Sequence, residues 1–109
     1  RPIDGGVKTQ GLHGYNGVDL AAPIGTPIHA SADGVVIIAR SSGYNGGYGS
    51  YVVIAHSNGT QTLYGHMNKV LATQGTYVSK GEIIGLLGNT GKSTGPHVHF
   101  EIRGATNPF

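Results

Sequence analysis

A short run near the C-terminus carries the side chains best suited to chemistry. In the run His97–Glu101 the residues alternate between polar and apolar, so in a β-strand His97, His99 and Glu101 share one face. The apolar residues between them then face a core. Neighbours on the polar face lie roughly 7 Å apart. Two histidines and a glutamate on one face favour a site for metal binding and proton transfer over a plain solvent-facing edge. Both histidines can bind one metal, or one can bind while the other moves protons, and the spacing alone does not choose.

A second candidate group lies near the N-terminus. His13 and Asp19 stand close together in a glycine-rich segment that can turn both side chains toward one cation. The chain has no cysteine, so any metal must be held by histidine or carboxylate side chains. Two histidines and one aspartate leave a fourth zinc position for water, which is the layout of a catalytic site.

His66 is the third candidate. In a strand its side chain lies on the same face as Tyr64, opposite Leu63 and Met67. A lone histidine in this position is more often structural, so the weight of His66 comes from the other two groups. The remaining histidines are interpreted as structural or surface residues: His29 and His56.

The elements that must position these residues are short strands. Of the 109 residues, 20 are glycine, which favours a sheet with many turns over helices. The β-branched and aromatic runs predict these strands: Pro27–Ala30, Val35–Arg40, Ser50–His56, Gln61–Met67, Thr76–Val78, Glu82–Leu87 and His97–Arg103. Asn58-Gly59 predicts a type I′ hairpin turn, and only Met67–Thr73 can make even a short helical turn. We therefore expect an all-β fold, as a small antiparallel sheet domain in a sandwich or partly closed barrel.

The chain is short enough for one domain. Residues 1–10 carry little pattern and are predicted to form a lead-in to a domain over residues 11–109. The segments Gly25–Ala39 and Thr76–Leu87 share an order of short strand, turn ending in glycine, and apolar strand. This echo predicts two similar halves, as in a barrel-sandwich hybrid.

The longest irregular stretch inside the predicted sheet is Ser41–Gly49. It contains Tyr44, Asn45 and Tyr48 among several glycines. This composition is compatible both with a wall of a substrate groove and with a flexible hairpin loop.

Charge and hydropathy exclude some partners. The net charge is +2 and the basic residues form no dense cluster, so no nucleic acid is expected. No stretch approaches the roughly 18 apolar residues of a membrane span, so this domain is not expected to insert into a membrane. The chain starts without a methionine and without a leader, so we expect a mature form or an excised domain. We also expect it to act as a monomer.

Several ordered motifs together resemble the LytM and lysostaphin-type zinc endopeptidases, which hydrolyse bacterial peptidoglycan. The resemblance covers Leu12 to Phe109. The motifs that carry it are these: Asn16–Pro23, Gly25–Ile28, Tyr64–Met67 and Ser93–Glu101. It implies a small antiparallel β domain with a groove across one sheet, one zinc ion per chain, and a location outside the cytoplasm. The implied substrate is the peptide stems or cross-bridges of peptidoglycan.

The resemblance also implies roles for individual residues. Asp19 and His99 are similar to zinc ligands of the family, and His97 and His66 to its catalytic pair. Glu101 is the next residue after His99 on the same strand face, so we expect it to orient a zinc ligand without binding the metal itself. The chain departs from the family at the first zinc histidine, which usually stands four residues before the aspartate, where this chain has Tyr15. We expect His13 to take that role.

The residues expected to contact substrate are Tyr15, Tyr44, Asn45 and Tyr48. Two rival interpretations stay open. A degenerate relative of the same family would bind the wall or activate another hydrolase without cutting. A lipoyl- or biotinyl-type carrier domain would need an exposed lysine at a hairpin tip, where Lys80 lacks the expected flanking residues and His97 and His99 would have no purpose.

Overall fold

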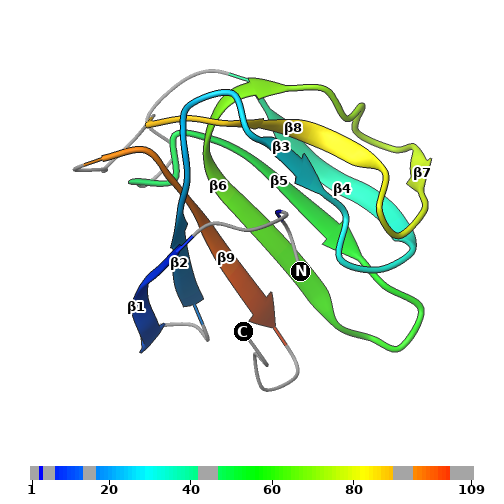
Figure 1. Ribbon diagram of the computed structural model, residues 1–109. Coiled ribbons are helices and arrows are strands. Elements are labelled where there is room, and N and C mark those ends of the chain that lie inside the picture. The colour runs from blue at the N-terminus through cyan, green and yellow to red at the C-terminus, as the bar shows by residue number, and fades with distance from the viewer. Residues whose placement is uncertain (1–2, 4–6, 14–16, 42–46, 90–94, 104–109) are drawn as a thin grey trace.

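The computed structural model describes residues 3, 7–13, 17–41, 47–89 and 95–103, and for residues 7–13, 17 and 18 it describes the backbone. These residues form nine antiparallel strands (Figure 1): β1 (Val7–His13), β2 (Gly17–Ala21), β3 (Pro27–His29), β4 (Gly34–Arg40), β5 (Ser50–Ala55), β6 (Gln61–Val70), β7 (Tyr77–Val78), β8 (Ile83–Leu87) and β9 (His97–Arg103). The strand order is β1-β2-β9-β6-β5-β4-β7, and β8 pairs with β6 and β3. The described part contains no α-helix and its sheet does not close into a barrel, so the predicted all-β antiparallel class is confirmed.

The predicted strands occur at nearly the predicted bounds, with two differences. β6 continues through Val70 because it pairs with β8 there, so Met67–Thr73, the one segment that allowed a short helical turn, begins as strand and contains no helix. β1 and β2 were not predicted, since glycine and polar residues hide their alternation. β2 is defined by long-range pairing, because all five of its residues pair with β9.

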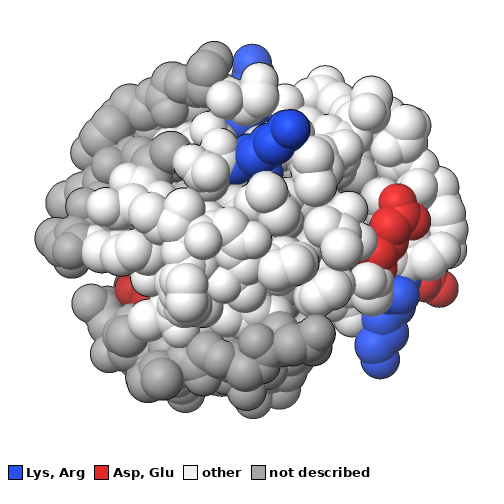
Figure 2. Space-filling view, turned by 45° about the horizontal axis from the view of Figure 1, so that its top comes forward, with Lys and Arg blue, Asp and Glu red and all other residues white. Residues whose placement is uncertain are grey.

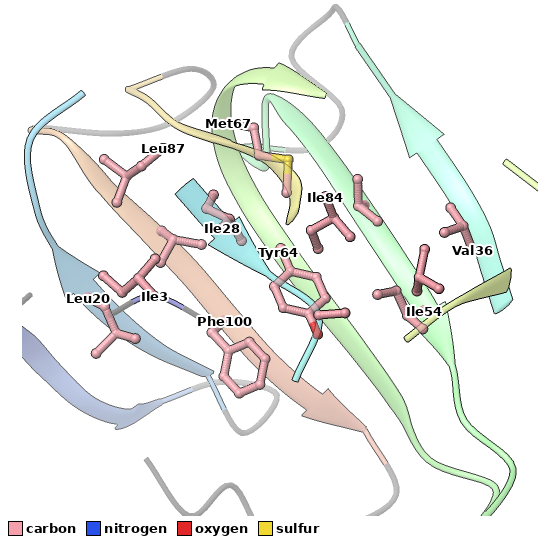
Figure 3. Packing of buried hydrophobic residues seen from close by; sticks show 14 residues of the cluster. Ile3, Leu20, Ile28, Val36, Ile54, Tyr64, Met67, Ile84, Leu87 and Phe100 are labelled. Atoms are coloured by element: carbon pink, nitrogen blue, oxygen red, sulfur yellow. The ribbon is translucent and has the colours of Figure 1, made fainter. Parts of the chain in front are cut away.

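The core forms between the main run of strands, β1-β2-β9-β6-β5-β4-β7, and the short pair of β3 and β8. In Figure 1 this pair lies across the main run. Leu20, Tyr64 and Phe100 enter it from β2, β6 and β9, and Ile28 enters from β3 (Figure 3). Ile3 also packs there and is fully buried. Burying one such side chain contributes roughly 1.5–3 kcal/mol, so this cluster helps to hold β2, β6 and β9 together.

The predicted alternation of β9 is confirmed on its apolar side. Val98 and Phe100 are completely buried in the core. The polar residues between them are therefore directed to the opposite face of the sheet.

The sequence echo corresponds to reciprocal strand pairing. The short strand of the first half, β3, pairs with the long strand of the second, β8, and β4 pairs with β7 in return. The two connecting turns also touch, since the Lys80 N–H donates a hydrogen bond to Asp33 Oδ1. The predicted similarity of the two halves thus appears as an exchange of strands between them.

The hairpin at Asn58-Gly59 joins β5 to β6 as predicted, but with another turn type. Gly59 has φ of 85°, whereas Asn58 is not among the residues with positive φ, and a type I′ turn needs both. The Asn58 side chain accepts hydrogen bonds from the Thr60 N–H and hydroxyl at 3.1 and 2.6 Å. The turn thus combines a side-chain hydrogen bond at Asn58 with a left-handed backbone conformation at Gly59 alone.

Charged side chains are sparse on the surface shown in Figure 2, where uncharged residues cover most of the described area. Within the described residues, no helix has the length and hydropathy needed to cross a bilayer.

Candidate active site

The strand order places β9 between β2 and β6, and these three strands carry the candidate site (Figure 1). His99 lies opposite Asp19 on β2 and opposite Gly65 on β6. Directly opposite residues share a face, with Cβ atoms roughly 5 Å apart. Residues from near the two ends of the chain therefore meet beside His66, which follows Gly65.

Both histidines of β9 converge on the carboxylate of Asp19. Its Oδ1 lies 2.8 Å from Nδ1 of His99 and 3.5 Å from Nε2 of His97. Asp19 is only 8% exposed, so the shorter contact is a charge-assisted hydrogen bond in a part-buried setting. The structure thus brings together three of the predicted site residues.

His99 lies between two carboxylates. Its Nε2 is 2.8 Å from Oε2 of Glu101, which is 2% exposed. Burial lowers the pKa of His99, but hydrogen bonds and charges from Asp19 and Glu101 outweigh burial and raise this pKa to about 9. Without a metal, His99 is therefore an imidazolium at neutral pH that donates one hydrogen bond to each carboxylate.

Glu101 is the centre of a small polar cluster behind His99. The Tyr48 hydroxyl donates to its Oε2 at 2.9 Å, and the Arg103 guanidinium lies 3.4 Å from its Oε1. Burial raises the pKa of Glu101, but hydrogen bonds from His99 and Tyr48 and the nearby positive charges outweigh it and lower this pKa. Arg103 was not predicted, although alternation along β9 places it on the same face as Glu101.

The side chain of His66 lies in the site, although regular alternation along β6 would place it on the core side with Tyr64. Tyr64 and Met67 both pack in the core. The His66 ring instead lies 4.6 Å from the ring of His97 and 6.1 Å from that of His99, between centroids. The prediction that His66 shares a face with Tyr64 is therefore wrong, whereas the prediction that it lies opposite Met67 is confirmed.

A β-bulge in β6 is the cause. His66 has φ of 60°, the one positive φ among the described non-glycine residues. Its N–H donates to the carbonyl oxygen of Tyr48 at 2.7 Å, which holds the bulge. The flanking partners show one extra residue on β6: Ser50 with Met67 and Val52 with Tyr64. A left-handed backbone costs a residue with a Cβ roughly 1–2 kcal/mol, and such strain concentrates at functional sites.

His97 has a defined proton arrangement. Its Nδ1 lies 2.8 Å from the carbonyl oxygen of Gly95. A carbonyl only accepts, so Nδ1 carries the proton and Nε2 is the acceptor of the neutral ring. Nε2 is also the atom that faces Asp19, so His97 is suited to take up a proton on the side where the other site residues converge.

Asp19 and His99 fit two positions of a zinc site. Zinc bonds of about 2.0–2.1 Å place neighbouring ligand atoms of a tetrahedral site about 3.3 Å apart. Asp19 Oδ1 and His99 Nδ1 are 2.8 Å apart, so a small separation admits an ion in place of the shared proton. Glu101 then lies where a carboxylate commonly fixes a ligating ring. Among the side chains that the structure describes, no three His, Cys, Asp or Glu residues form a group that could hold a metal.

The predicted third ligand, His13, is described by its backbone. It ends β1 and pairs with Gly17, two positions before Asp19 on the neighbouring strand. The pairing of β1 with β2 is irregular between Gln10, which is the partner of Asp19, and His13. Its role as a ligand stays a prediction. Three residues predicted to contact substrate lie outside the described residues: Tyr15, Tyr44 and Asn45.

The other two histidines are bonded elsewhere in the fold, in keeping with a structural role. His29 Nδ1 lies 3.0 Å from the carbonyl oxygen of Gly81. His56 contacts the carbonyl oxygen of Asp33 at 2.7 Å and the Thr62 hydroxyl at 2.8 Å.

Curated relatives are peptidases. The peptidoglycan DD-endopeptidase ShyA of Vibrio cholerae is 49% identical over 88 residues, which are 81% of this chain and 20% of ShyA. The DD-carboxypeptidase/endopeptidase Mpg of Neisseria meningitidis is 52% identical over 89 residues, which are 82% of this chain and 20% of Mpg. The chain therefore spans about a fifth of the length of these relatives.

Solved structures similar to this chain are also peptidases. The catalytic domain of lysostaphin from Staphylococcus simulans has a TM-score of 0.81 at 34% identity, over 89% of this chain and 79% of that chain. A zinc-containing peptidase from Vibrio cholerae has a TM-score of 0.74 at 39% identity, over 94% of this chain and 33% of that chain. The family model described as peptidase family M23 matches residues 13–109, a range that includes every residue of the candidate site. The chain belongs to peptidase family M23.

Proposed function

We propose that this chain is the catalytic domain of a zinc-dependent endopeptidase that hydrolyses the peptides of bacterial peptidoglycan. The observation that carries the proposal is the convergence of His97 and His99 on Asp19, with His66 turned into the same place by a strained bulge. Relatives named peptidoglycan DD-endopeptidases and a zinc-containing structural neighbour support the choice of substrate and metal.

Zinc is proposed to be held by Asp19 and His99 together with His13, one ion per chain. When bound, zinc supplies a Lewis acid that polarises a peptide carbonyl and makes water acidic enough to react near neutral pH. The remaining coordination position is left to water and substrate, as in other catalytic zinc sites.

The proton chemistry is assigned to two histidines. His97 accepts the proton of the attacking water at Nε2, because its Nδ1–H is bonded to Gly95. His66, whose ring is 4.6 Å from that of His97, opposes the negative charge that develops on the carbonyl oxygen. Asp19 and Glu101 keep the His99 ring fixed while this happens.

The proposed substrate is a D,D-peptide cross-link. The peptidoglycan DD-endopeptidase ShyA is 49% identical to this chain and the DD-carboxypeptidase/endopeptidase Mpg is 52% identical, against 34% for the lysostaphin domain. Because peptidoglycan lies outside the cytoplasm, the proposal places the domain there. We further propose that the domain acts as a monomer, without insertion into a membrane.

The test combines metal analysis with digestion of purified peptidoglycan. We expect about one zinc per chain, release of cleaved cross-linked muropeptides detected by mass spectrometry, and loss of cleavage in excess chelator with recovery on added zinc. His97→Ala is the inactive control. Complete cleavage in excess chelator would contradict the proposed role of zinc.

A second candidate, a non-cutting relative that binds the wall, is favoured by one observation. Tyr15 stands where the family pattern has a histidine ligand, and the described side chains supply only two zinc positions. Binding to peptidoglycan without cleavage, by protein that contains no zinc, would establish this alternative.

A further inference from the structure

Tyr48 contacts both strands that carry the candidate histidines. Its carbonyl oxygen accepts the His66 N–H at 2.7 Å, and its hydroxyl donates to Glu101 at 2.9 Å. Its ring stacks on that of His99, with centroids 6.0 Å apart and an interplanar angle of 28°. A single residue before β5 therefore touches β6 through its main chain and β9 through its side chain.

The polar atom of Tyr48 is engaged inside the protein. Glu101 Oε2 receives two hydrogen bonds, one from the Tyr48 hydroxyl and one from His99 Nε2. The Tyr48 oxygen also lies 3.4 Å from a guanidinium nitrogen of Arg103. Because Glu101 is 2% exposed, this cluster fixes the carboxylate that in turn fixes the His99 ring.

We propose that Tyr48 is a positioning residue of this site, which orients His99 through Glu101 and holds His66 through its own carbonyl group. The inference rests on the proposed function, since it treats His99 as a zinc ligand and His66 as catalytic. It replaces the expectation that Tyr48 contacts substrate, because the Tyr48 hydroxyl is hydrogen-bonded to Glu101, the carboxylate that contacts His99.

The two roles predict opposite effects. Loss of a hydrogen bond behind a ligand loosens the ring, and such changes typically lower metal affinity or activity by roughly 10–100-fold. Loss of a substrate contact raises KM and leaves the metal in place. A positioning role therefore lowers zinc affinity and kcat while KM stays nearly constant.

Tyr48→Phe tests the inference, because it removes the hydroxyl and keeps the ring. Tyr51→Phe is the matched control, since its ring packs against Tyr48 at 5.4 Å and it is not assigned to the site. Zinc affinity is measured for both purified variants by competition with a chromogenic chelator, and kcat and KM with a cross-linked muropeptide. We expect a loss of zinc affinity of about tenfold or more for Tyr48→Phe, and less than about twofold for Tyr51→Phe.

Unchanged zinc affinity in Tyr48→Phe, or a rise in KM alone, overturns the inference. A second readout separates it from the proposed function. In metal-free protein, the His99 ring nitrogen signals in a ¹⁵N NMR spectrum should move in Tyr48→Phe and stay in place in Tyr51→Phe. If wild-type protein bound no zinc, the proposed function would fail, while an unmoved His99 signal would still overturn the positioning role.

Discussion

Asp19 and Glu101 hold His99 from opposite edges of its ring, at 2.8 Å each. This arrangement fixes the orientation of the ring: Nδ1 faces Asp19, and Nε2 is hydrogen-bonded to Glu101. His97, two positions away on the same strand, is turned the other way by Gly95, so that its Nε2 faces Asp19. These two orientations support the different roles proposed for the histidines, His99 as a zinc ligand and His97 as a proton acceptor.

The first residue-scale prediction concerns the third zinc ligand. Imidazole binds zinc as a neutral group, whereas a phenol must first lose a proton with an ordinary pKa near 10. We therefore expect His13→Ala to lower zinc affinity by more than about 100-fold, beyond the range for residues behind a ligand. Tyr15→Phe should retain zinc. Chelator competition on both variants measures this, and the reverse pattern would assign the ligand to Tyr15.

The second residue-scale prediction separates chemistry from metal binding. His97→Ala and His66→Ala should each lower kcat by about 10²–10⁴-fold, the usual contribution of a positioned acid or base. Both variants should keep about one zinc per chain, because neither residue is proposed as a ligand. A folded variant that purifies without zinc would make the substituted residue a ligand instead.

At the scale of elements, the bulge of β6 controls which histidines can meet. Without the extra residue, His66 would face the core with Tyr64, since alternate residues of a strand share a face. The φ of 60° at His66 and its bond to the Tyr48 carbonyl reverse this direction. The strand thus serves the core and the site in adjacent residues, because Met67 returns to the core at once.

This backbone strain predicts an unusual order of stabilities. At His66, glycine should be more stable than alanine by about 0.5–1 kcal/mol, because relief of the left-handed penalty exceeds the entropy cost of glycine. Asn68 on the same strand is the control, where alanine should be more stable than glycine. Urea unfolding of the four variants measures both differences. If alanine were more stable than glycine at both positions, His66 would carry no such strain.

At the scale of the whole molecule, one core holds together strands that come from both ends of the chain. Leu20, Tyr64 and Phe100 pack on one side of β2, β6 and β9, and the candidate site occupies the other side. The packing of the core therefore fixes the positions of the strands that carry the candidate site. The same arrangement buries charged groups beside the core, which makes the stability of the protein depend on pH.

The pH prediction applies to metal-free protein. The pKa of His99 in the folded state is about 9, above its ordinary value near 6.5. Its interactions therefore stabilise the fold fully below about pH 6.5 and are lost as the pH rises through 9. This difference between the folded and ordinary pKa of His99 corresponds to roughly 3 kcal/mol in the free energy of unfolding. Denaturant titrations in chelator between pH 6 and 10 should show this decline.

The matched variant is His99→Gln, which cannot be protonated and should show a much flatter profile over the same range. A wild-type free energy of unfolding that stays constant from pH 6 to 10 would contradict the assignment of the elevated pKa.

The fold class and much of the site followed from the sequence alone, because local patterns carry them. Alternation in His97–Arg103 placed the two histidines and Glu101 opposite the core, and β-branched runs marked most strands. Ordered motifs identified the family resemblance that the comparisons confirm. Asp19 and His99 could be paired in advance only through that resemblance, since they are 80 residues apart.

Other features were decided by the tertiary structure. β2 forms because β9 is beside it, and no local signal marks it. The bulge that turns His66 depends on the register of β5 against β6 and on the carbonyl group of Tyr48. The Tyr48 hydroxyl meets Glu101, 53 residues away in the chain. In each case the deciding contact joins distant segments, and a one-residue change in register reverses a side chain, so only the assembled sheet determines the outcome.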